Sequence, residues 1–375
     1  MRLVLVFTLV AAAAFGQSIV DGTRLSPDLK SFERRDDDRP LRCEVFPFRP
    51  ALNFSFRFEA GYVVRVPMSQ YSGPGHGWAV LARVTPQAGN REPVYLAGRV
   101  RLPNVPPTKL IWETGGAYLL GEGRYHVSWK MFDDSGRTCR KEWDIEAKLR
   151  RSERGVKTTM PPNGIADLSL RGAPVARYTD DAAPQRLTIL LHAAPVFPRR
   201  TRLGARDRFM LLSTLSSVLE RVPAKFVRLV VFNLMQQKEL YRQEGFGLDS
   251  LRQVSRALEG VQLQTVDYHV LQNRTGHLDL ITDLVNREVT AETPSDVVVF
   301  LGPEAIYSDK VPRTGLEKPR GASPRFFYLQ YRYPFFHPAT LADSITRAVA
   351  GVKGKTVVIH SPGDLAKAIE QIERR

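Results

Sequence analysis

The sequence lacks the marks of several common protein classes. It holds only two cysteines in 375 residues, which excludes a disulfide-dense small scaffold and a four-cysteine zinc site. No apolar run approaches the roughly 20 residues of a membrane-spanning helix. No serine lies on a nucleophile elbow, and no glycine-rich loop ends in the Lys-Ser or Lys-Thr pair of a phosphate cradle. Function must therefore be inferred from compartment, architecture and charge.

The longest apolar run lies at the start of the chain. Residues 3–15 are almost unbroken in apolar character, and Ala14 and Gly16 place small side chains before a possible cut ahead of Gln17. This pattern predicts a secretory signal peptide over residues 1–16. Because the run is too short to span a bilayer, we expect an exported protein, secreted or periplasmic, without a membrane span.

The two cysteines, Cys43 and Cys139, both lie in the first half of the chain. An even pair in an exported chain favours a disulfide, and two separate buried thiols are the alternative. A bond closing a loop of roughly 100 residues would stabilise the fold by about 4–5 kcal/mol in the chain-entropy model. A zinc site is not expected, because structural zinc takes four ligands at short spacing.

Acidic residues are in deficit. The chain has 54 Lys and Arg against 39 Asp and Glu, a formal net charge of +15 and a pI near 10.0. Outside the cytosol this charge favours an acidic polysaccharide, an anionic lipid surface or an acidic protein as partner, with nucleic acid a weaker option. The alternative is a well-solvated surface without a ligand, since charge alone does not specify one.

The first half of the chain shows the pattern of an all-β domain. Residues 17–40 are polar with charges of both signs and are interpreted as a flexible lead. Residues 41–150 contain short alternating runs separated by glycine and proline, which predicts an immunoglobulin-like β-sandwich. The disulfide would join its first strand to its penultimate one. The expected strands are 53–58, 62–66, 78–84, 94–100, 124–130 and 142–147.

The second half shows a different pattern. Residues 151–184 are interpreted as a linker with a short strand near 165–170. Over residues 185–375, continuous apolar runs alternate with helical spacing, which predicts a doubly wound α/β domain with a mostly parallel sheet covered on both faces. The expected strands are 187–191, 226–234, 262–271, 296–301, 325–331 and 356–360, and the expected helices are 205–221, 248–259, 277–289, 338–349 and 363–372.

This order of strands and helices, after an export signal and an immunoglobulin-like first half, resembles the von Willebrand factor type A domains of bacterial exported proteins. That family often holds a divalent ion through an Asp-x-Ser-x-Ser loop, a threonine and an aspartate at the end of the fourth strand. Here the first strand runs into residues 191–195 without Asp or Ser, Thr275 is present, and Leu301 stands before Gly302 where the aspartate would be. The resemblance therefore implies a domain without the metal, and no cofactor is expected.

Arginines crowd the segment that follows the first strand of this second domain. Arg199, Arg200 and Arg202 precede a helix start, and a second basic segment follows the fourth strand. The carboxyl ends of parallel strands share one edge, and helix starts favour anions, so this edge is the predicted anion-binding mouth. The alternative is a pair of solvated arginine-rich loops. The predicted ligand-binding residues are Arg199, Arg200, Arg202, His192, Thr275 and Glu304.

Three functional classes remain open. The sequence favours an exported binding or adhesion protein that engages a protein or an acidic glycan in the cell envelope without a divalent metal. The second class is a cell-envelope hydrolase in which His192 and Glu304 carry out acid–base catalysis. The third is a structural subunit of an envelope complex. No two histidines have the spacing of a metal motif, so the sequence names no catalytic residue.

Overall fold

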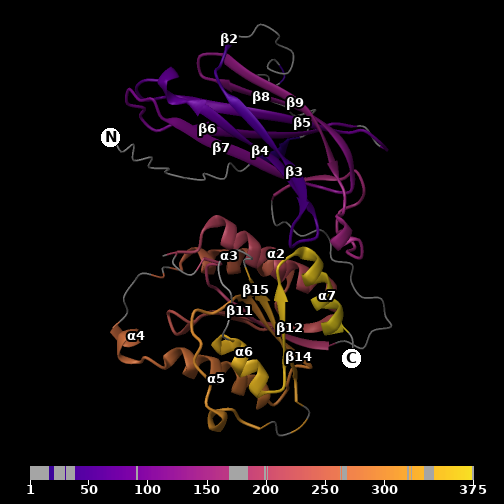
Figure 1. Cartoon of the computed structure of the whole chain (residues 1–375), viewed down its shortest axis with the longest axis vertical. Helices are drawn as coiled ribbons and strands as arrows, with labels where there is room; N and C mark the ends of the chain where they lie inside the picture. Colours follow the sequence, from indigo (N-terminus) through magenta and orange to yellow (C-terminus); the bar gives the residue numbers. More distant parts are fainter. Residues whose placement is uncertain are drawn as a thin grey trace, which may run out of the picture. The chain divides into compact units, whose positions relative to one another are not determined.

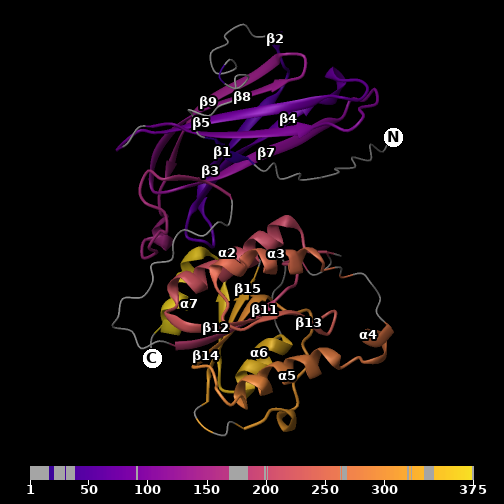
Figure 2. The same ribbon diagram turned by 180° about the vertical axis from the view of Figure 1, so that it is seen from behind.

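The computed structural model describes residues 17–20, 30, 39–89, 92–168, 185–197, 200, 202–261, 263, 268–318, 321, 323–332 and 342–373. The predicted signal peptide, residues 169–184 of the predicted linker and Arg199 lie outside these residues. The chain forms two compact units, Met1–Ser169 and Leu170–Arg375, which we call unit 1 and unit 2 (Figures 1 and 2). Within the described residues, no helix is long and apolar enough to cross a membrane.

Unit 1 is built from two β-sheets. One sheet has the order β1-β6-β5-β8-β9-β2 and is antiparallel except for the β2–β9 pair. Its strands are β1 (Ser18–Val20), β2 (Arg39–Pro40), β5 (Gly77–Pro86), β6 (Val94–Arg101), β8 (Gly123–Asp133) and β9 (Arg137–Ala147). The other is antiparallel with the order β10-β7-β4-β3. Its strands are β3 (Glu44–Leu52), β4 (Phe58–Pro67), β7 (Ile111–Leu120) and β10 (Ile165–Asp167).

Strict alternation in the strands builds the core between these sheets. In β8 every second residue from Tyr125 to Asp133 is buried, while the residues between them are partly exposed. The ring of Tyr62 in β4 lies 5.2 Å from that of Trp129 in β8, centroid to centroid, in an edge-on contact. The inner faces of the two sheets therefore pack together, and the other face of each strand carries the polar residues.

The prediction of a strand over residues 53–58 is wrong. The chain turns between β3 and β4, and Phe56 has a φ of 55°, in the left-handed region. The side-chain oxygen of Asn53 accepts hydrogen bonds from the backbone N–H groups of Ser55 (3.0 Å) and Arg57 (3.2 Å). An asparagine that bonds its own following backbone favours a turn over an extended strand.

The predicted flexible lead is also corrected in part. Residues Ser18–Val20 form β1, which pairs antiparallel with β6 so that Ile19 lies opposite Leu96. Gln17 is buried, with 8% of its surface exposed. The lead therefore contributes a strand to the six-stranded sheet, which its polar composition did not indicate.

The disulfide between Cys43 and Cys139 is present, as predicted, with Cα atoms 6.3 Å apart and a sequence separation of 96. Cys43 lies just before β3 and Cys139 lies within β9, so the bond joins the two sheets. At the same edge, the Nζ of Lys141 donates to the backbone oxygen of Val45 (2.9 Å). β3 is the last strand of its sheet and contains Pro47 and Pro50.

Unit 2 has one six-stranded sheet of order β13-β12-β11-β14-β15-β16, parallel except for β13. Helices α2, α3 and α7 cover one face, and α5 and α6 cover the other (Figures 1 and 2). The strands are β11 (Gln185–His192), β12 (Ala224–Asn233), β13 (Lys238–Gln243), β14 (Val297–Pro303), β15 (Arg325–Tyr331) and β16 (Lys355–Ile359). The helices are α2 (Ala205–Arg221), α3 (Leu251–Glu259), α4 (Tyr268–Gln272), α5 (Gly276–Val289), α6 (Ser344–Gly351) and α7 (Pro362–Glu373).

The prediction of a strand over residues 262–271 is also wrong. Tyr268–Gln272 is helix α4, and most of the remaining segment lies outside the described residues. The third strand in the sequence order of this sheet is instead β13, which returns antiparallel to β12 after a turn in which Gln237 has a φ of 51°. β13 is an edge strand with the polar sequence KELYRQ, so it lacks the apolar run by which the central strands were predicted.

Candidate functional site

The structure places β11 directly beside β14, so the segments after these strands leave the same edge of the unit 2 sheet. The shared edge is what the sequence analysis expected of parallel strands. The side chains in that edge, however, bind to one another.

Arg200 bonds to a carboxylate of its own chain. Its Nη1 lies 3.2 Å from the Oδ2 of Asp207, which is 3% exposed. The same oxygen accepts from the N–H of Gly204 (2.9 Å), and the other accepts from the N–H of Val196 (3.2 Å). Asp207 thus occupies the start of α2, where free N–H groups and the helix dipole favour an anion. The start of α2, where an external anion was predicted to bind, is therefore occupied by the Asp207 carboxylate. Arg202 is exposed nearby.

His192 is a buried structural residue. It is 3% exposed, its Nδ1 lies 3.2 Å from the backbone oxygen of Pro303, and its ring stacks on that of Phe232 at 5.2 Å. Burial lowers the pKa of His192 to about 4, because the charged imidazolium would lose its hydration. The ring is therefore neutral at physiological pH.

Glu304 and Thr275 also have local partners. Both carboxylate oxygens of Glu304 accept from Arg332, at 3.2 and 3.0 Å. Thr275 is the N-cap residue just before α5, and its Oγ1 donates to the Oδ1 of Asn273 (3.2 Å). Among the described residues, no group of three or more His, Cys, Asp or Glu could hold a metal ion.

A different set of side chains meets on the outer face of the six-stranded sheet of unit 1. The strand register places Leu81 of β5 opposite Lys130 of β8, and Lys130 opposite Arg140 of β9. Two residues along the strands, Arg83 lies opposite Ser128, and Ser128 lies opposite Glu142. On the other side, Tyr95 of β6 lies opposite Arg83. These two rows cross four strands, and we call the surface they form the basic groove.

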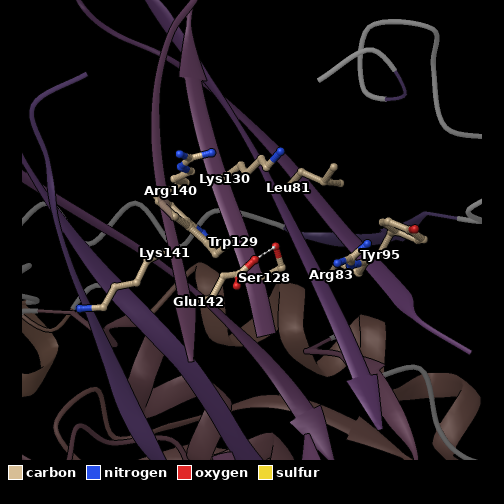
Figure 3. Close-up of a pocket in the computed structure, with 9 residues that line it drawn as sticks. All are labelled: Leu81, Arg83, Tyr95, Ser128, Trp129, Lys130, Arg140, Lys141 and Glu142. Carbon is tan, nitrogen blue, oxygen red and sulfur yellow. Dashed lines mark hydrogen bonds between the residues drawn. The ribbon is translucent and has the colours of Figure 1, made fainter. Parts of the chain in front are cut away.

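The basic groove encloses about 480 Å³, a size that holds a small ligand or a short stretch of polymer (Figure 3). Its lining contains four basic residues and one acidic residue, Glu142. The Oγ of Ser128 donates to that carboxylate at 3.1 Å. The residues that line the groove are Leu81, Arg83, Tyr95, Ser128, Trp129, Lys130, Arg140, Lys141 and Glu142.

The middle of the groove is apolar. Leu81 is only 4% exposed although it lies on the outer face, because Val20, Tyr95 and Phe132 pack against it. The strand β1, which supplies Val20, therefore helps to build this floor. The groove combines an apolar floor with cationic sides.

The positive charges oppose each other across the strands. Cβ atoms of directly opposite residues are about 5 Å apart, and like charges there destabilise a sheet. Lys130 and Arg140 are such a pair. An anion seated over the pair would reduce this repulsion, which makes the groove a favourable place for a carboxylate or sulfate group.

These residues are not among those predicted from the sequence. Arg83, Lys130 and Arg140 come from three strands and are brought together only by the register of the sheet. The available signal was their place on the polar face of each alternating strand, which fixes a face but not a neighbour.

No family model and no curated protein matches the chain. A structure of the putative ApaA protein from Bordetella pertussis is 14% identical and aligns over 30% of this chain and 99% of that one, with a TM-score of 0.20. A β-glucosidase from Listeria innocua is 12% identical over 29% of this chain and 17% of its own, with a TM-score of 0.18. A glycosyl hydrolase family 2 member from Bacteroides cellulosilyticus is 11% identical over 84% of this chain and 37% of its own, with a TM-score of 0.22. Such TM-scores assign no family.

Proposed function

We propose that this chain is an exported binding protein that engages an acidic glycan through the basic groove of unit 1, without a divalent metal. The observation that carries the proposal is the cross-strand row of Lys130 and Arg140, with Arg83 in the next row. Rows on one face of a strand are about 7 Å apart, so several negative groups of one polymer can each meet a cation. Individually weak contacts of this kind add along a repeating polyanion.

The apolar floor favours a glycan over a simple counter-ion. A sugar ring has apolar C–H faces, which pack on aromatic side chains such as that of Tyr95, which itself lies against the buried Leu81. An acidic sugar brings such a ring and a negative group together. An acidic protein segment is the other partner that the charge would accept, and it is an outcome of the test below.

The architecture proposed for the two units is an immunoglobulin-like sandwich followed by a von Willebrand factor type A-like domain. Two packed sheets support the first assignment, and the adjacency of β11 and β14 in a mostly parallel sheet supports the second. The disulfide supports export, since such bonds persist in oxidising compartments.

The hydrolase alternative is less well supported. A general acid–base pair needs groups that a substrate can reach. His192 is 3% exposed, and Glu304 is bound by both its oxygens to Arg332. A binding role is the better explanation of the described geometry.

The test is a charge reversal in the groove. The double variant Lys130→Glu/Arg140→Glu should weaken binding to polygalacturonate and to heparin on the order of 100-fold at moderate salt, because two contacts become repulsions. The matched control is Arg101→Glu, an exposed residue of β6 outside the groove lining. Biolayer interferometry with both polymers, and with a poly-glutamate peptide, measures the affinities.

The outcomes separate the alternatives. Loss of polymer binding in the groove variant with near-natural binding in Arg101→Glu supports the proposal. A tighter interaction with poly-glutamate than with either polysaccharide would replace the glycan by an acidic protein. Equal polymer affinities of the groove variant and the control would overturn the role of the groove. If only Arg202→Glu lost polymer binding, the binding site would lie in unit 2.

A further inference from the structure

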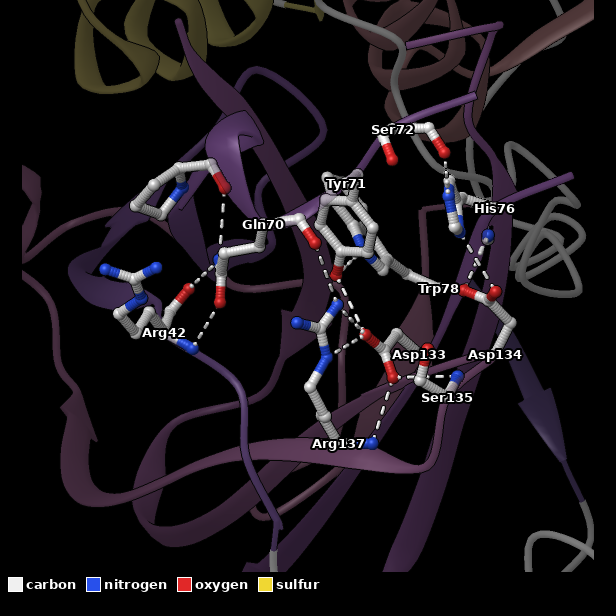
Figure 4. Close-up of polar contacts among 12 residues, drawn as sticks. Arg42, Gln70, Tyr71, Ser72, His76, Trp78, Asp133, Asp134, Ser135 and Arg137 are labelled. Carbon is white, nitrogen blue, oxygen red and sulfur yellow. Dashed lines mark hydrogen bonds and ion pairs between the residues drawn. The ribbon is translucent and has the colours of Figure 1, made fainter. Parts of the chain in front are cut away.

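A second hollow lies at one end of unit 1, beside the turn that joins β8 to β9. It encloses about 360 Å³. Its lining residues are Arg39, Gln70, Tyr71, Ser72, His76, Ser135 and Arg137. This lining contains two arginines, a histidine and two serines but no carboxylate. We call it the end hollow, and Figure 4 shows the polar contacts around six of its lining residues, Gln70, Tyr71, Ser72, His76, Ser135 and Arg137.

Arg137 is held firmly at the wall of the end hollow. Its Nε and Nη2 lie 2.8 and 2.7 Å from the Oδ2 of Asp133, whose side chain is fully buried. Its guanidinium also lies over the ring of Tyr71, 4.9 Å from the centroid. A quarter of the Arg137 side chain stays exposed, so it can meet a ligand without a large entropic cost of ordering.

The supports of Arg137 are themselves fixed. Asp133 Oδ1 accepts from the backbone N–H groups of Ser135 (3.0 Å) and Arg137 (2.9 Å). The hydroxyl of Tyr71 donates to Asp133 (3.1 Å) and accepts from the indole N–H of Trp78 (2.8 Å). This network arranges the wall of the hollow before any ligand arrives.

Arg39 brings a second guanidinium to the same hollow. It is exposed, and it is the register partner of Arg137 in the parallel β2–β9 pair. The buried Asp133 bonds Arg137. Two arginines on neighbouring strands repel each other. An anion between the two would be stabilised by both.

His76 adds a cation that depends on pH. Its Nδ1 lies 3.0 Å from the Oδ2 of Asp134, and its Nε2 lies 2.9 Å from the backbone oxygen of Ser72. Because both ring nitrogens face acceptors, the doubly protonated ring makes both bonds, and the Ser72 carbonyl and then the Asp134 carboxylate raise the pKa of His76. The charged and titratable groups around the ring and the hollow are Asp133, Asp134, Tyr71, Arg137 and Arg39.

We propose that the end hollow is a second anion site, which binds one tetrahedral oxyanion, a sulfate or phosphate group, between Arg39 and Arg137. The site is separate from the basic groove. Residues in β8 and β9 alternate between the faces of the sheet, so Arg137 belongs to the buried row of Met131 and Asp133, whereas Arg140 belongs to the outer row. Unit 1 can therefore hold two acidic groups at once, from one polymer or from two.

Titration of the whole chain with inorganic sulfate tests the site. We expect Arg39→Gln to weaken sulfate binding about tenfold in isothermal calorimetry, because one charge-assisted bond is lost. The matched control is Arg42→Gln, an exposed neighbour whose contacts with Gln70 run through its backbone. Equal sulfate affinities in the two variants would overturn the proposal.

The pH dependence gives an independent readout. Sulfate keeps its charge between about pH 5.5 and about pH 8, so a weaker affinity at the higher pH reports the loss of the His76 proton. His76→Gln should abolish this dependence, and a dependence that persists in the variant would remove His76 from the site. Parallel titrations with phosphate and acetate distinguish a tetrahedral anion from a carboxylate; tighter binding of acetate would overturn the stated ligand class.

The proposed anion site in the end hollow rests on other residues than the proposed glycan function, so the two can be tested separately. Lys130→Glu/Arg140→Glu should leave sulfate affinity at the end hollow within about twofold, since those residues lie on the other face of the sheet. A loss of sulfate binding in that variant would assign the sulfate to the basic groove and overturn the second site. If this variant loses polymer binding but keeps its sulfate affinity, the proposed anion site in the end hollow is supported.

Discussion

The positive charges of the two units have different neighbours. In unit 2, Arg200 approaches a buried carboxylate of its own chain, Asp207, at the start of α2. In unit 1, Lys130 and Arg140 lie opposite each other on neighbouring strands, and the groove lining holds one acid, which a serine already bonds. The first arrangement pairs a cation with a carboxylate of the same segment, whereas the second brings several cations together on one face of a sheet.

This difference shows why an arginine-rich segment is a poor guide to an anion site. The density of arginine is highest in the sequence around Arg199–Arg208, yet Asp207 in the same segment supplies the counter-charge. The cations of the basic groove come from three strands over residues 83–141 and gather only in the folded sheet. Folding, not local density in the sequence, decides which charges come together.

The largest expected effect concerns what holds each unit together. Unit 1 contains the disulfide, so Cys43→Ser/Cys139→Ser should lower its free energy of unfolding by about 4–5 kcal/mol, because a loop close to 100 residues is no longer closed in the unfolded chain. All four tryptophans of the chain lie in unit 1, so tryptophan fluorescence during urea unfolding reports this unit. The circular dichroism of the helices reports unit 2 and should keep its midpoint. Equal shifts of both signals would show that the units do not unfold independently.

A smaller effect is expected from acid, and it should be confined to unit 2. The folded pKa of His192 is about 4, below the ordinary histidine value of 6.5, so the unfolded chain binds the proton more tightly. The stability contributed by the neutral ring is complete above about pH 6.5 and declines as pH falls towards 4, by about 3 kcal/mol in total and about 2 kcal/mol at pH 5. His192→Phe, which keeps the stacking on Phe232, should lack this part of the decline.

Urea unfolding near pH 7 and near pH 5, followed by helical circular dichroism, measures the difference. His126→Gln is the control, because His126 lies at the surface with 40% of its side chain exposed. An acid sensitivity that is unchanged in His192→Phe would contradict the burial of a neutral ring.

The smallest effect tests the comparison of charges itself. Asp207→Asn should lower the stability of unit 2 by about 1–2 kcal/mol, since the start of α2 loses its carboxylate acceptor. It should also free Arg200 for an external anion. In the Lys130→Glu/Arg140→Glu background, where the basic groove is silent, retention on heparin should rise a few-fold.

Asp249→Asn, which removes an exposed carboxylate of unit 2, is the matched control for this gain. If both aspartate variants raise retention equally, net charge and not the release of Arg200 explains the effect. The contrast between the units would then lose its support.

Much of the fold could be predicted from the sequence, and the reasons are local. Helix α2 has the bounds that its spacing predicts, and β15 matches its apolar run, because each is set by its own residues. The strand expected over residues 53–58 failed because the Asn53 side chain stabilises a turn, which alternation alone does not reveal. β13 was missed because an exposed edge strand need not be apolar.

The candidate sites were beyond such reasoning for a physical reason. The groove joins Arg83, Lys130 and Arg140, and the end hollow joins Arg39 to Arg137 across β2 and β9. Both depend on strand register, and a slip of one residue would turn each side chain to the other face. The cysteine pair was predictable because the choice was between one bond and none.

Strand β3 has a consequence for the proposed binding to a polymer. Crowding many copies along one chain raises their local concentration and brings sheet edges into contact, a condition that promotes edge-to-edge aggregation. Pro47 and Pro50 have no backbone N–H to offer at that edge, which interrupts the hydrogen-bond ladder that a second copy would need. Dense coats of this protein should therefore remain collections of separate molecules.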